Sequence, residues 1–562
     1  MNFIGNNKYS NWFLEFRKST EYSAFVKNPI AYFCAEYALD SSLPTYAGGL
    51  GVLAGDFVRE AAVSPFPLVS VGLLYKKAQS ILSLEKHEEK HKLKIVLDKN
   101  NQEIIVELPI EERIVRAKAW QWEENDAKVY LLDTDIPEND PRDREITERL
   151  YDENRDIRLK QEILLGIGGF RLLARLGYHC SVYHLNEGHS AFLALELVRH
   201  EMEHQQANFP EACEYAKKHI LFSNHTLVLA GQEQFASEKV ALFLEKYAEE
   251  FGLQGKDIAA LGVTAEYNNL FSMTALSFKL STKSNAVSKL HAQEARKVWP
   301  NQTMDSITNG IYLPRWDKIT DASASSIWES HLENKRKLLL LVKEKTGEVW
   351  EETDLIFAWA RRLVEYKQPL LFLDNMDKLL KISKNSPVPI RIIFSGPTRE
   401  QDNEFDAKIK KIIKEMLKDN AAFIPNYSID VAKILTAGAD IWLNTPLVGF
   451  EACGTSGMKA GLNGVLSLST RDGWIYEVDE SDIGWIINEK DLEGDIFSLV
   501  EKKIIPLYFD HFKNSKDSLW IKRIERVRNL ILENFSTSRV LQEYIEKLYI
   551  PILKQKHTHK VN

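Results

Sequence analysis

The chain has 562 residues, too many for one hydrophobic core, so we expect at least two domains. Hydrophobic residues make up 44% and charged residues 27%, as in globular proteins, and the net charge of −8 argues against a nucleic-acid partner. No apolar run reaches the roughly 20 residues of a membrane-spanning helix, and four cysteines without paired spacing or a recognisable signal peptide predict a cytoplasmic protein.

The first half of the chain predicts strands joined by glycine-containing turns. A strand is expected at residues 30–38, followed by Gly48 and Gly49, whose backbone can approach a phosphate closely. Further strands are expected at 67–75, 94–108 and 128–133, with a hairpin turn at 98–102. The glycines of residues 166–169 follow a helical pattern, which predicts close helix packing rather than a dinucleotide-binding loop.

One motif in this half is typical of zinc peptidases. Residues 87–91 read HEEKH, a pattern that on a buried helix places His87 and His91 on one metal ion. Charged residues flank the motif on both sides, and no convincing third ligand follows closely. We therefore interpret it as a solvated charged face and predict no metal site.

The second half alternates between strand-like and helix-like segments. Strands are expected at 389–395, 421–425 and 439–444, and helices at 406–418, at 431–437 and around Lys459. This order predicts a doubly wound parallel sheet, in which ligands bind beyond the carboxyl ends of the strands. The segment EACGTSGMK at 451–459 places small residues ahead of a helix, so free N–H groups can bind an anion there. A desolvated Lys459 in that helix would be a reactive amine.

The segment from Glu451 to Gly464, EACGTSGMKAGLNG, resembles the cofactor segment of the α-glucan phosphorylases, the glycogen, starch and maltodextrin enzymes. GGLG at 48–51, NHT at 224–226, TNGI at 308–311 and RRLVEYK at 361–367 resemble further segments of that family in the expected order. The resemblance implies two Rossmann-like doubly wound domains facing across a cleft, the glycosyltransferase B-type fold. Residues 1–310 would form the glucan and phosphate side. Residues 311–562 would bind pyridoxal 5′-phosphate, with the last helices packing back on the first domain.

The resemblance also implies an activity. The family catalyses reversible phosphorolysis of terminal α-1,4-glucosidic bonds, releases α-D-glucose 1-phosphate and retains configuration, with the cofactor's 5′-phosphate as a proton relay. The implied partners are an α-1,4-glucan, whose sugar rings suit the twelve Trp and twenty Tyr side chains, and inorganic phosphate. No nucleic acid or membrane partner is expected, and a homodimer stays open.

The same resemblance assigns site residues by position. Lys459 would carry the cofactor, and the residues expected to bind it with Lys459 are Trp316, Arg361, Tyr427, Gly454 and Thr455. The residues expected in catalysis are His225, Arg362, Lys367, Glu451 and Lys459. The residues expected to bind glucan or phosphate are Gly48, Gly49, His225, Asn309, Arg362, Tyr366, Lys367, Glu451, Cys453 and Gly454. His189 either touches sugar or cofactor, or is a satisfied structural histidine.

Several positions depart from the family pattern. Cys453 replaces a serine, GPTRE at 396–400 stands where a lysine-containing segment is common, and LVGF at 447–450 replaces a basic, proline-rich lead. Leu229 and Gln232 differ on the acceptor side. A catalytically impaired glucan-binding homologue is therefore the alternative, ahead of a nucleotide-sugar glycosyltransferase without a lysine-bound cofactor and of a zinc peptidase. Segments for phosphorylation or nucleotide control are not recognisable, so such allosteric control is expected to be absent.

Overall fold

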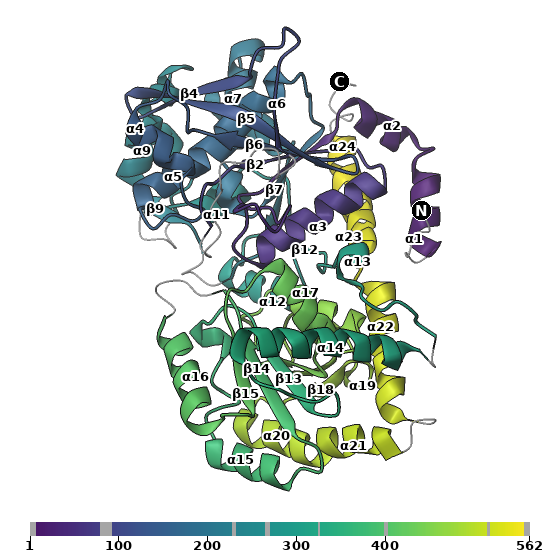
Figure 1. The fold of residues 1–562 in the computed structure, drawn as a ribbon. Coiled ribbons are helices and arrows are strands. Elements are labelled where there is room, and N and C mark those ends of the chain that lie inside the picture. The colour runs from purple at the N-terminus through teal and green to yellow at the C-terminus, as the bar shows by residue number, and fades with distance from the viewer. Residues whose placement is uncertain are drawn as a thin grey trace. The chain divides into compact units, whose positions relative to one another are not determined.

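The computed structural model describes residues 7–78, 93–227, 232–264, 270–323, 326–397, 403–513 and 518–555. The motif with His87 and His91 lies outside these described residues. The chain divides into two compact units (Figure 1). The N-terminal unit contains Asn7–Val287, Ala292–Ile307 and the chain from Thr537 onward, and the C-terminal unit contains Ser288–His291 and Thr308–Ser536.

A ten-stranded sheet forms the centre of the N-terminal unit, in the order β12-β11-β8-β7-β1-β2-β6-β5-β3, with β4 paired to β5. The strands from β12 to β6 are parallel, and β5 is antiparallel to its neighbours. Their bounds are β1 Ile30–Phe33, β2 Leu68–Leu73, β3 Leu93–Ile95, β4 Ile105–Ile110, β5 Arg113–Glu124, β6 Ala127–Asp133, β7 Val182–Asn186, β8 Ile220–Asn224, β11 Lys283–Ala286 and β12 Asp305–Ser306. A separate antiparallel pair joins β9 Gln234–Ala236 and β10 Leu270–Ser272.

Helices cover both faces of this sheet, as the buried strands require. Successive strand residues point to opposite faces, so Ala31 and Phe33 of β1 join one hydrophobic cluster while Ile30 and Tyr32 join another. The covering helices include α3 Gly49–Val63, α5 Arg155–Ile163, α6 Gly169–Arg175, α7 Leu193–Gln205, α8 Phe209–Lys217, α9 Ser237–Glu249 and α11 Met273–Lys279.

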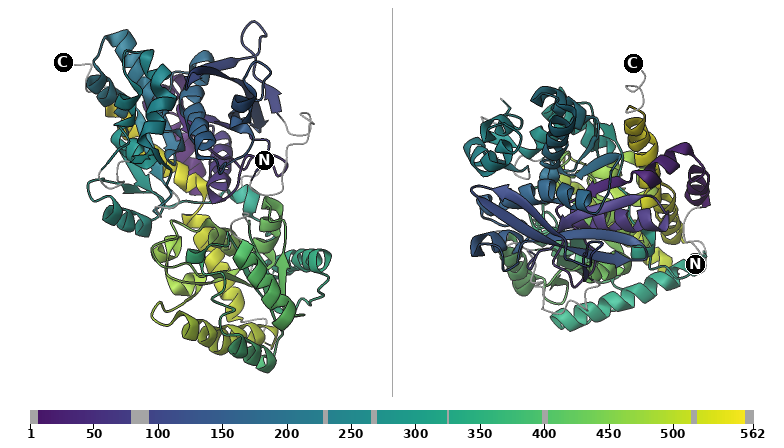
Figure 2. Two further views of the ribbon diagram at one scale, coloured as in Figure 1. Left: turned by 90° about the vertical axis from the view of Figure 1, so that its left-hand side faces the viewer. Right: turned by 90° about the horizontal axis from the view of Figure 1, so that it is seen from above.

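The last helices of the chain belong to this unit. α23 Thr537–Tyr544 and α24 Ile550–Gln555 flank a π-helical turn and pack with the N-terminal helices α1 Asn7–Phe16 and α2 Thr20–Lys27 and with α3. In Figures 1 and 2 these yellow helices lie beside the purple N-terminal segment. Ser538 donates a hydrogen bond of 2.8 Å to Glu60 of α3. Residues almost 500 positions apart therefore share one core.

Two local predictions for this unit are settled by the geometry. Close packing at residues 166–169 is confirmed, because a Cβ on Gly166 would lie 2.7 Å from the backbone nitrogen of Leu193. The turn at 98–102 is also confirmed, since the Asp98 carboxylate accepts from the N–H groups of Asn100 and Gln102. β5, which pairs with β3, β4 and β6, has no counterpart among the predicted strands.

A six-stranded parallel sheet forms the C-terminal unit, in the order β15-β14-β13-β16-β17-β18. Its strands are β13 Leu355–Ala360, β14 Ile390–Ser395, β15 Ala421–Ile424, β16 Ile441–Asn444, β17 Leu466–Ser469 and β18 Gly484–Ile486. The predicted α/β class with parallel sheets is therefore confirmed. The helices are α13 Leu313–Trp316, α14 Ile327–Thr346, α15 Met376–Asn385, α16 Asn403–Met416, α17 Ile429–Gly438, α18 Thr455–Leu462, α19 Glu480–Ile483, α20 Leu492–Leu499, α21 Ile505–Lys513 and α22 Leu519–Asn534.

Both faces of this second sheet are also covered. Ile356 and Ala358 of β13 pack with α14 and α17, and α14 crosses the sheet in Figure 1. Phe357 points the other way and packs through Phe372 onto Phe497 of α20. In the part of the chain that the structure describes, no helix has the length and apolarity to cross a lipid bilayer.

Candidate active site

The C-terminal unit brings several predicted residues together where two neighbouring strands end. β13 and β16 are adjacent and parallel, so the residues that follow them meet at one edge of the sheet. Arg361 follows β13 directly, and the loop after β16 leads through Glu451 to α18. Gly396, with φ +156°, lies so close that a Cβ would sit 1.9 Å from the Arg361 carbonyl oxygen.

Glu451 is bound by two cations at this edge. Nη1 of Arg361 donates to Oε2 of Glu451 at 2.9 Å, and the Lys367 ammonium donates to the same oxygen. Nη2 of Arg361 donates to Ser456 Oγ at 3.2 Å. Arg361 Nε is buried and has no hydrogen-bond partner among the described residues. The donor set thus has capacity left for a further anion.

Arg362 and Lys367 add positive charge around Tyr366. The Lys367 ammonium lies 4.9 Å from the centre of the Tyr366 ring, and Arg362 contacts the Tyr366 phenol. Burial, only partly opposed by Glu451, lowers the pKa of Lys367 to about 8. The cations, Lys367 first, lower the pKa of Glu451 to about 2 against the opposing effect of its burial. Two cations, Arg361 and Lys367, thus contact the Glu451 carboxylate, and Arg362 adds a third positive charge at Tyr366.

Lys459 lies on the same helix as Ser456, one turn later. Residues three apart share a helix face, so Lys459 projects from the side of α18 that Arg361 reaches. Its side chain is buried, with Nζ 4.0 Å from the centre of the Trp316 ring. α18 begins after Gly454, whose φ is +79°, and this glycine at the N-cap position has no side chain to bind the first N–H groups. The helix start is therefore available to an anion.

Asn463 fixes the other end of α18. Its Nδ2 donates to the carbonyl oxygens of Lys459 and Trp316, both at 2.9 Å, and its Oδ1 accepts from Lys318 N at 2.8 Å. From α22, Arg528 adds a bond of 2.5 Å to the Leu462 carbonyl oxygen. The backbones of Lys459 and Trp316 are thus held to one another.

Three further predicted residues of this unit, Asn309, Tyr427 and Cys453, are buried or half-buried. Asn309 is 5% exposed and precedes Gly310, where a Cβ would meet the Phe535 carbonyl oxygen at 2.7 Å. Tyr427 packs on the hydrophobic cluster that contains Ala460 of α18. Cys453 is buried, and its carbonyl oxygen accepts from Trp474 N at 2.9 Å.

Two residues of this site had no predicted role. Ser456 binds Arg361, and Asp472 accepts from the backbone N–H groups of Phe450 and Glu451 at 3.2 and 2.9 Å. Burial raises the pKa of Asp472 to about 6. Asp472 thus shapes the loop that carries Glu451. Asp472 and Gly473 form an Asp-Gly pair, a turn signal that is visible in the sequence, and Gly473 has φ +55°.

In the N-terminal unit, a carboxylate holds the glycine loop. Glu36 Oε2 accepts from the N–H groups of Ala47 and Gly48 at 2.6 and 3.0 Å, and Tyr151 donates to Oε1 at 2.9 Å. A Cβ on Gly48 or Gly49 would meet no atom within 4 Å. The loop therefore borders open space, while the Gly48 N–H is already bound within the protein. Glu36, three residues after the end of β1, had no predicted role.

His225 follows β8 and is fixed by two side chains. Its backbone N–H donates to Glu187 Oε2 at 2.9 Å, and its Nε2 lies 2.7 Å from Asn186 Oδ1. Burial lowers the pKa of His225 to about 4, so the ring is neutral near pH 7. His225 belongs to the N-terminal unit, whereas Arg361, Lys367, Glu451 and Lys459 belong to the C-terminal unit.

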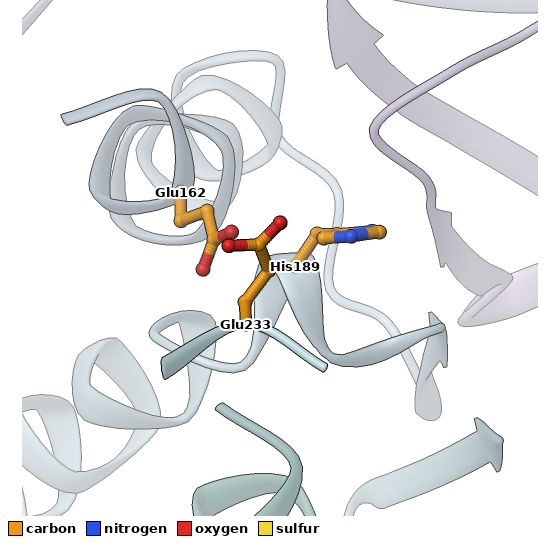
Figure 3. Close-up of side chains that lie close together, drawn as sticks. All are labelled: Glu162, His189 and Glu233. Atoms are coloured by element: carbon orange, nitrogen blue, oxygen red, sulfur yellow. The ribbon is translucent and has the colours of Figure 1, made fainter. Parts of the chain in front are cut away.

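His189 lies in a buried polar cluster of the N-terminal unit. One ligand-type atom each from Glu162, His189 and Glu233 lies within 4.8 Å of the others. Figure 3 shows the carboxyl groups of Glu162 and Glu233 pointing toward each other and the His189 ring pointing away from them. Arg158 Nη2 lies 3.6 Å from Glu162 and 3.1 Å from Glu233. This guanidinium already supplies the positive charge that a metal ion would bring.

The comparisons with known proteins agree with this geometry. The family model of the carbohydrate phosphorylases matches residues 317–485, which include Lys459 and the Arg361 cluster. Maltodextrin phosphorylase of Thermococcus litoralis is 35% identical, over 97% of this chain and 72% of its own length. Glycogen phosphorylases of Aquifex aeolicus and Mycobacterium tuberculosis are 31% and 28% identical, over 98% and 96% of this chain and 91% and 73% of their own lengths. The chain belongs to the carbohydrate phosphorylase family.

Proposed function

We propose that the chain is an α-glucan phosphorylase that carries pyridoxal 5′-phosphate on Lys459. In this reaction inorganic phosphate cleaves the terminal α-1,4 bond of a glucan such as maltodextrin, glycogen or starch, and α-D-glucose 1-phosphate is released with retained configuration. The observation that carries the proposal is the gathering of Arg361, Lys367 and Glu451 beside the start of the helix that bears Lys459. The names of the relatives support the substrate class.

The residues of the C-terminal unit fit the cofactor. A phosphorylated aromatic aldehyde needs an amine, a flat apolar neighbour and donors for its phosphate. Lys459 lies against Trp316, α18 begins without a side-chain cap, and the buried Arg361 Nε lacks a partner among the described residues. We assign Lys459 to the aldehyde, and Arg361 with the N–H groups around Thr455 to the phosphate. When bound, the cofactor supplies a phosphate group that can exchange a proton with inorganic phosphate.

The cations of the site meet an electrostatic need. Two unit negative charges about 5 Å apart repel by roughly 3 kcal/mol at an effective dielectric of about 20, and two dianions by about four times as much. Arg361, Arg362 and Lys367 offset this repulsion. Because the pKa of Lys367 is about 8, its amine is mostly protonated at pH 7 and can bind inorganic phosphate. Fixed donors of this kind also stabilise charge that develops in the transition state.

We assign the binding of the sugar to Glu451 and His225. The carboxylate of Glu451 accepts hydrogen bonds, and a substrate hydroxyl can replace one of its cation contacts. Neutral His225 keeps one ring nitrogen as an acceptor for a sugar hydroxyl. As the C1–O4 bond breaks, a C1–O bond to phosphate forms, and the glycosidic oxygen receives its proton from inorganic phosphate.

The test is a turnover assay with the full chain. Purified protein, as isolated and after incubation with pyridoxal 5′-phosphate, is given maltodextrin and inorganic phosphate, and glucose 1-phosphate is measured. The proposal predicts release by the cofactor-loaded protein and none by Lys459→Arg, a substitution that keeps the charge. If the cofactor-loaded wild type releases no glucose 1-phosphate, the proposal is wrong and the impaired glucan-binding homologue takes its place.

A further inference from the structure

Glu187 has a backbone conformation that side chains other than glycine rarely adopt. It follows β7 directly with φ +73° and ψ 167°. This region is essentially reserved for glycine. The sequence here is Asn-Glu-Gly, so the glycine stands one position later, at Gly188. A strained residue persists only where its surroundings hold it, and such residues gather at functional sites.

The surroundings of Glu187 show what the strain achieves. Its N–H donates to the Ser223 carbonyl oxygen of β8 at 3.0 Å, which continues the pairing of the two strands. Its side chain is buried, with Oε2 accepting from His225 N at 2.9 Å and Oε1 from Gly188 N at 3.1 Å. The Thr226 hydroxyl also donates to it. The turned backbone therefore aims the carboxylate at the chain that follows β8.

The neighbouring Asn186 fixes the imidazole of His225. Asn186 Nδ2 donates to Cys34 Sγ at 3.3 Å, which leaves Oδ1 as the atom that faces His225. Since an amide oxygen can only accept, Nε2 of His225 carries the proton. Nδ1 is then the acceptor. Adjacent residues thus fix both parts of His225, with Glu187 on the backbone and Asn186 on the ring.

We propose that Glu187 is a positioning residue, whose strained backbone directs its carboxylate onto the His225 N–H so that His225 presents an acceptor nitrogen to a sugar hydroxyl. This inference rests on the proposed function, because that function supplies the sugar. Glu187 acts through His225 and does not itself bind substrate. Its strain is the cost of this placement, because a glycine would adopt the same backbone without it.

The protonation state of Glu187 bears on the same bonds. Burial raises the pKa of Glu187 to about 7, and the groups facing it are His225, Glu233, Glu162 and Cys34. A protonated carboxyl has a hydroxyl on one oxygen, and that oxygen then faces an N–H or O–H donor without a good acceptor. The hold on His225 is therefore complete only well above pH 7 and weakens as the pH falls through about 7.

The test compares Glu187→Gly and Glu187→Gln with wild type and with Glu60→Gln, a buried glutamate bound to Ser64 and Ser538 elsewhere in the unit. Glu187→Gly relieves the strain but leaves the N–H groups of His225 and Gly188 without their carboxylate acceptor, so we expect its midpoint of thermal unfolding to stay within a few degrees of the wild type. Its turnover of maltodextrin is expected to fall about tenfold or more, as for a lost transition-state hydrogen bond. Glu60→Gln should keep its turnover per folded molecule.

Two further readouts separate positioning from a general structural role. Hydrogen exchange of the His225 amide, followed by mass spectrometry, should be at least about tenfold faster in Glu187→Gly. Wild-type turnover should decline below pH 7 as Glu187 becomes protonated. The pH profile of Glu187→Gln, measured with the same substrates, should lack this titration. Wild-type turnover in Glu187→Gly, or unchanged exchange of the His225 amide, would overturn the inference. An inactive wild type with faster exchange in the variant would refute the proposed function and leave the role of Glu187 in place.

Discussion

Replacing Glu451 by Gln removes the one anion that both Arg361 and Lys367 contact among the described residues. The pKa of Glu451 is lowered from 4.5 to about 2, a stabilisation of about 3 kcal/mol, while the pKa of Lys367 is lowered from 10.5 to about 8, a cost of similar size. Burial thus opposes the attraction within this ion pair. The main effect of Glu451 is on the protonation of Lys367, which it favours by about 4 kcal/mol if the attraction is taken as that of two unit charges roughly 4 Å apart at an effective dielectric of about 20.

Glu451→Gln is thus expected to lower the pKa of Lys367 clearly below about 8, so that the amine is neutral at pH 7. A small acylating reagent attacks only the neutral amine. In the wild type about one tenth of Lys367 is neutral at pH 7, given its pKa of about 8, so labelling should rise about tenfold in the variant. Cofactor-free protein is labelled between pH 6 and 10, and the peptide with Lys367 is quantified by mass spectrometry.

Glu477→Gln provides the matched control, because the Glu477 side chain is 8% exposed and binds Lys289 N and Thr308 Oγ1 in the same unit without contacting Lys367 in the described structure. Its labelling profile should equal that of the wild type. The pH dependence of the wild type's stability should also reflect the lowered pKa of Glu451. A lowered pKa stabilises above pH about 4.5 and loses this effect as the pH falls toward about 2, and Glu451→Gln should lack that loss. Equal labelling of Lys367 in wild type and Glu451→Gln would refute the electrostatic reasoning.

Two other substitutions test the support of the site. Asn463→Ala removes the hydrogen bonds to Lys459, Trp316 and Lys318 and should lower the free energy of unfolding by about 2–4 kcal/mol. It should also speed the loss of the cofactor's absorbance on dialysis. Full retention of the cofactor would contradict the role of Asn463 in holding Lys459 and Trp316 together. Asp440→Asn weakens a fully buried network with Lys335 Nζ at 2.6 Å, His331 Nε2 at 3.2 Å and Ile356 N at 2.8 Å, and should cost about 3–5 kcal/mol in urea titrations. Lys433→Met removes a partly exposed pair with Asp430, in which the side chains are 30% and 58% exposed, and should cost less than about 1 kcal/mol. Equal losses in Asp440→Asn and Lys433→Met would contradict the larger effect expected for the buried network.

The parts of the fold that sequence predicted are those with a local signal. The strands β14, β15 and β16 and the helix α18 follow from apolar runs that end at glycine, proline or small residues. β5 escaped prediction because charged residues such as Arg116 and Lys118 alternate with its buried ones, and a half-exposed antiparallel strand lacks a continuous apolar run.

The site shows the same division. Lys459, Arg361 and Glu451 stand in motifs that resemble a known family, so they were predicted from the sequence. Glu36 and Glu187 were not, because their roles arise where distant segments meet. Glu187 lies 38 residues before His225, and only the parallel pairing of β7 with β8 places its carboxylate on the His225 N–H. The backbone strain of Glu187 has no sequence signal, since a glutamate before a glycine is ordinary.

The attachment of the cofactor to Lys459 is the central claim, and borohydride reduction followed by peptide mapping tests it most directly. Reduction fixes pyridoxal 5′-phosphate on the lysine that holds it, and the mass of the labelled peptide identifies that lysine. The account predicts one labelled peptide, the one that contains Lys459, and no label in Lys459→Arg. A protein that takes up no label, or takes it up on another lysine such as Lys367, would contradict the account.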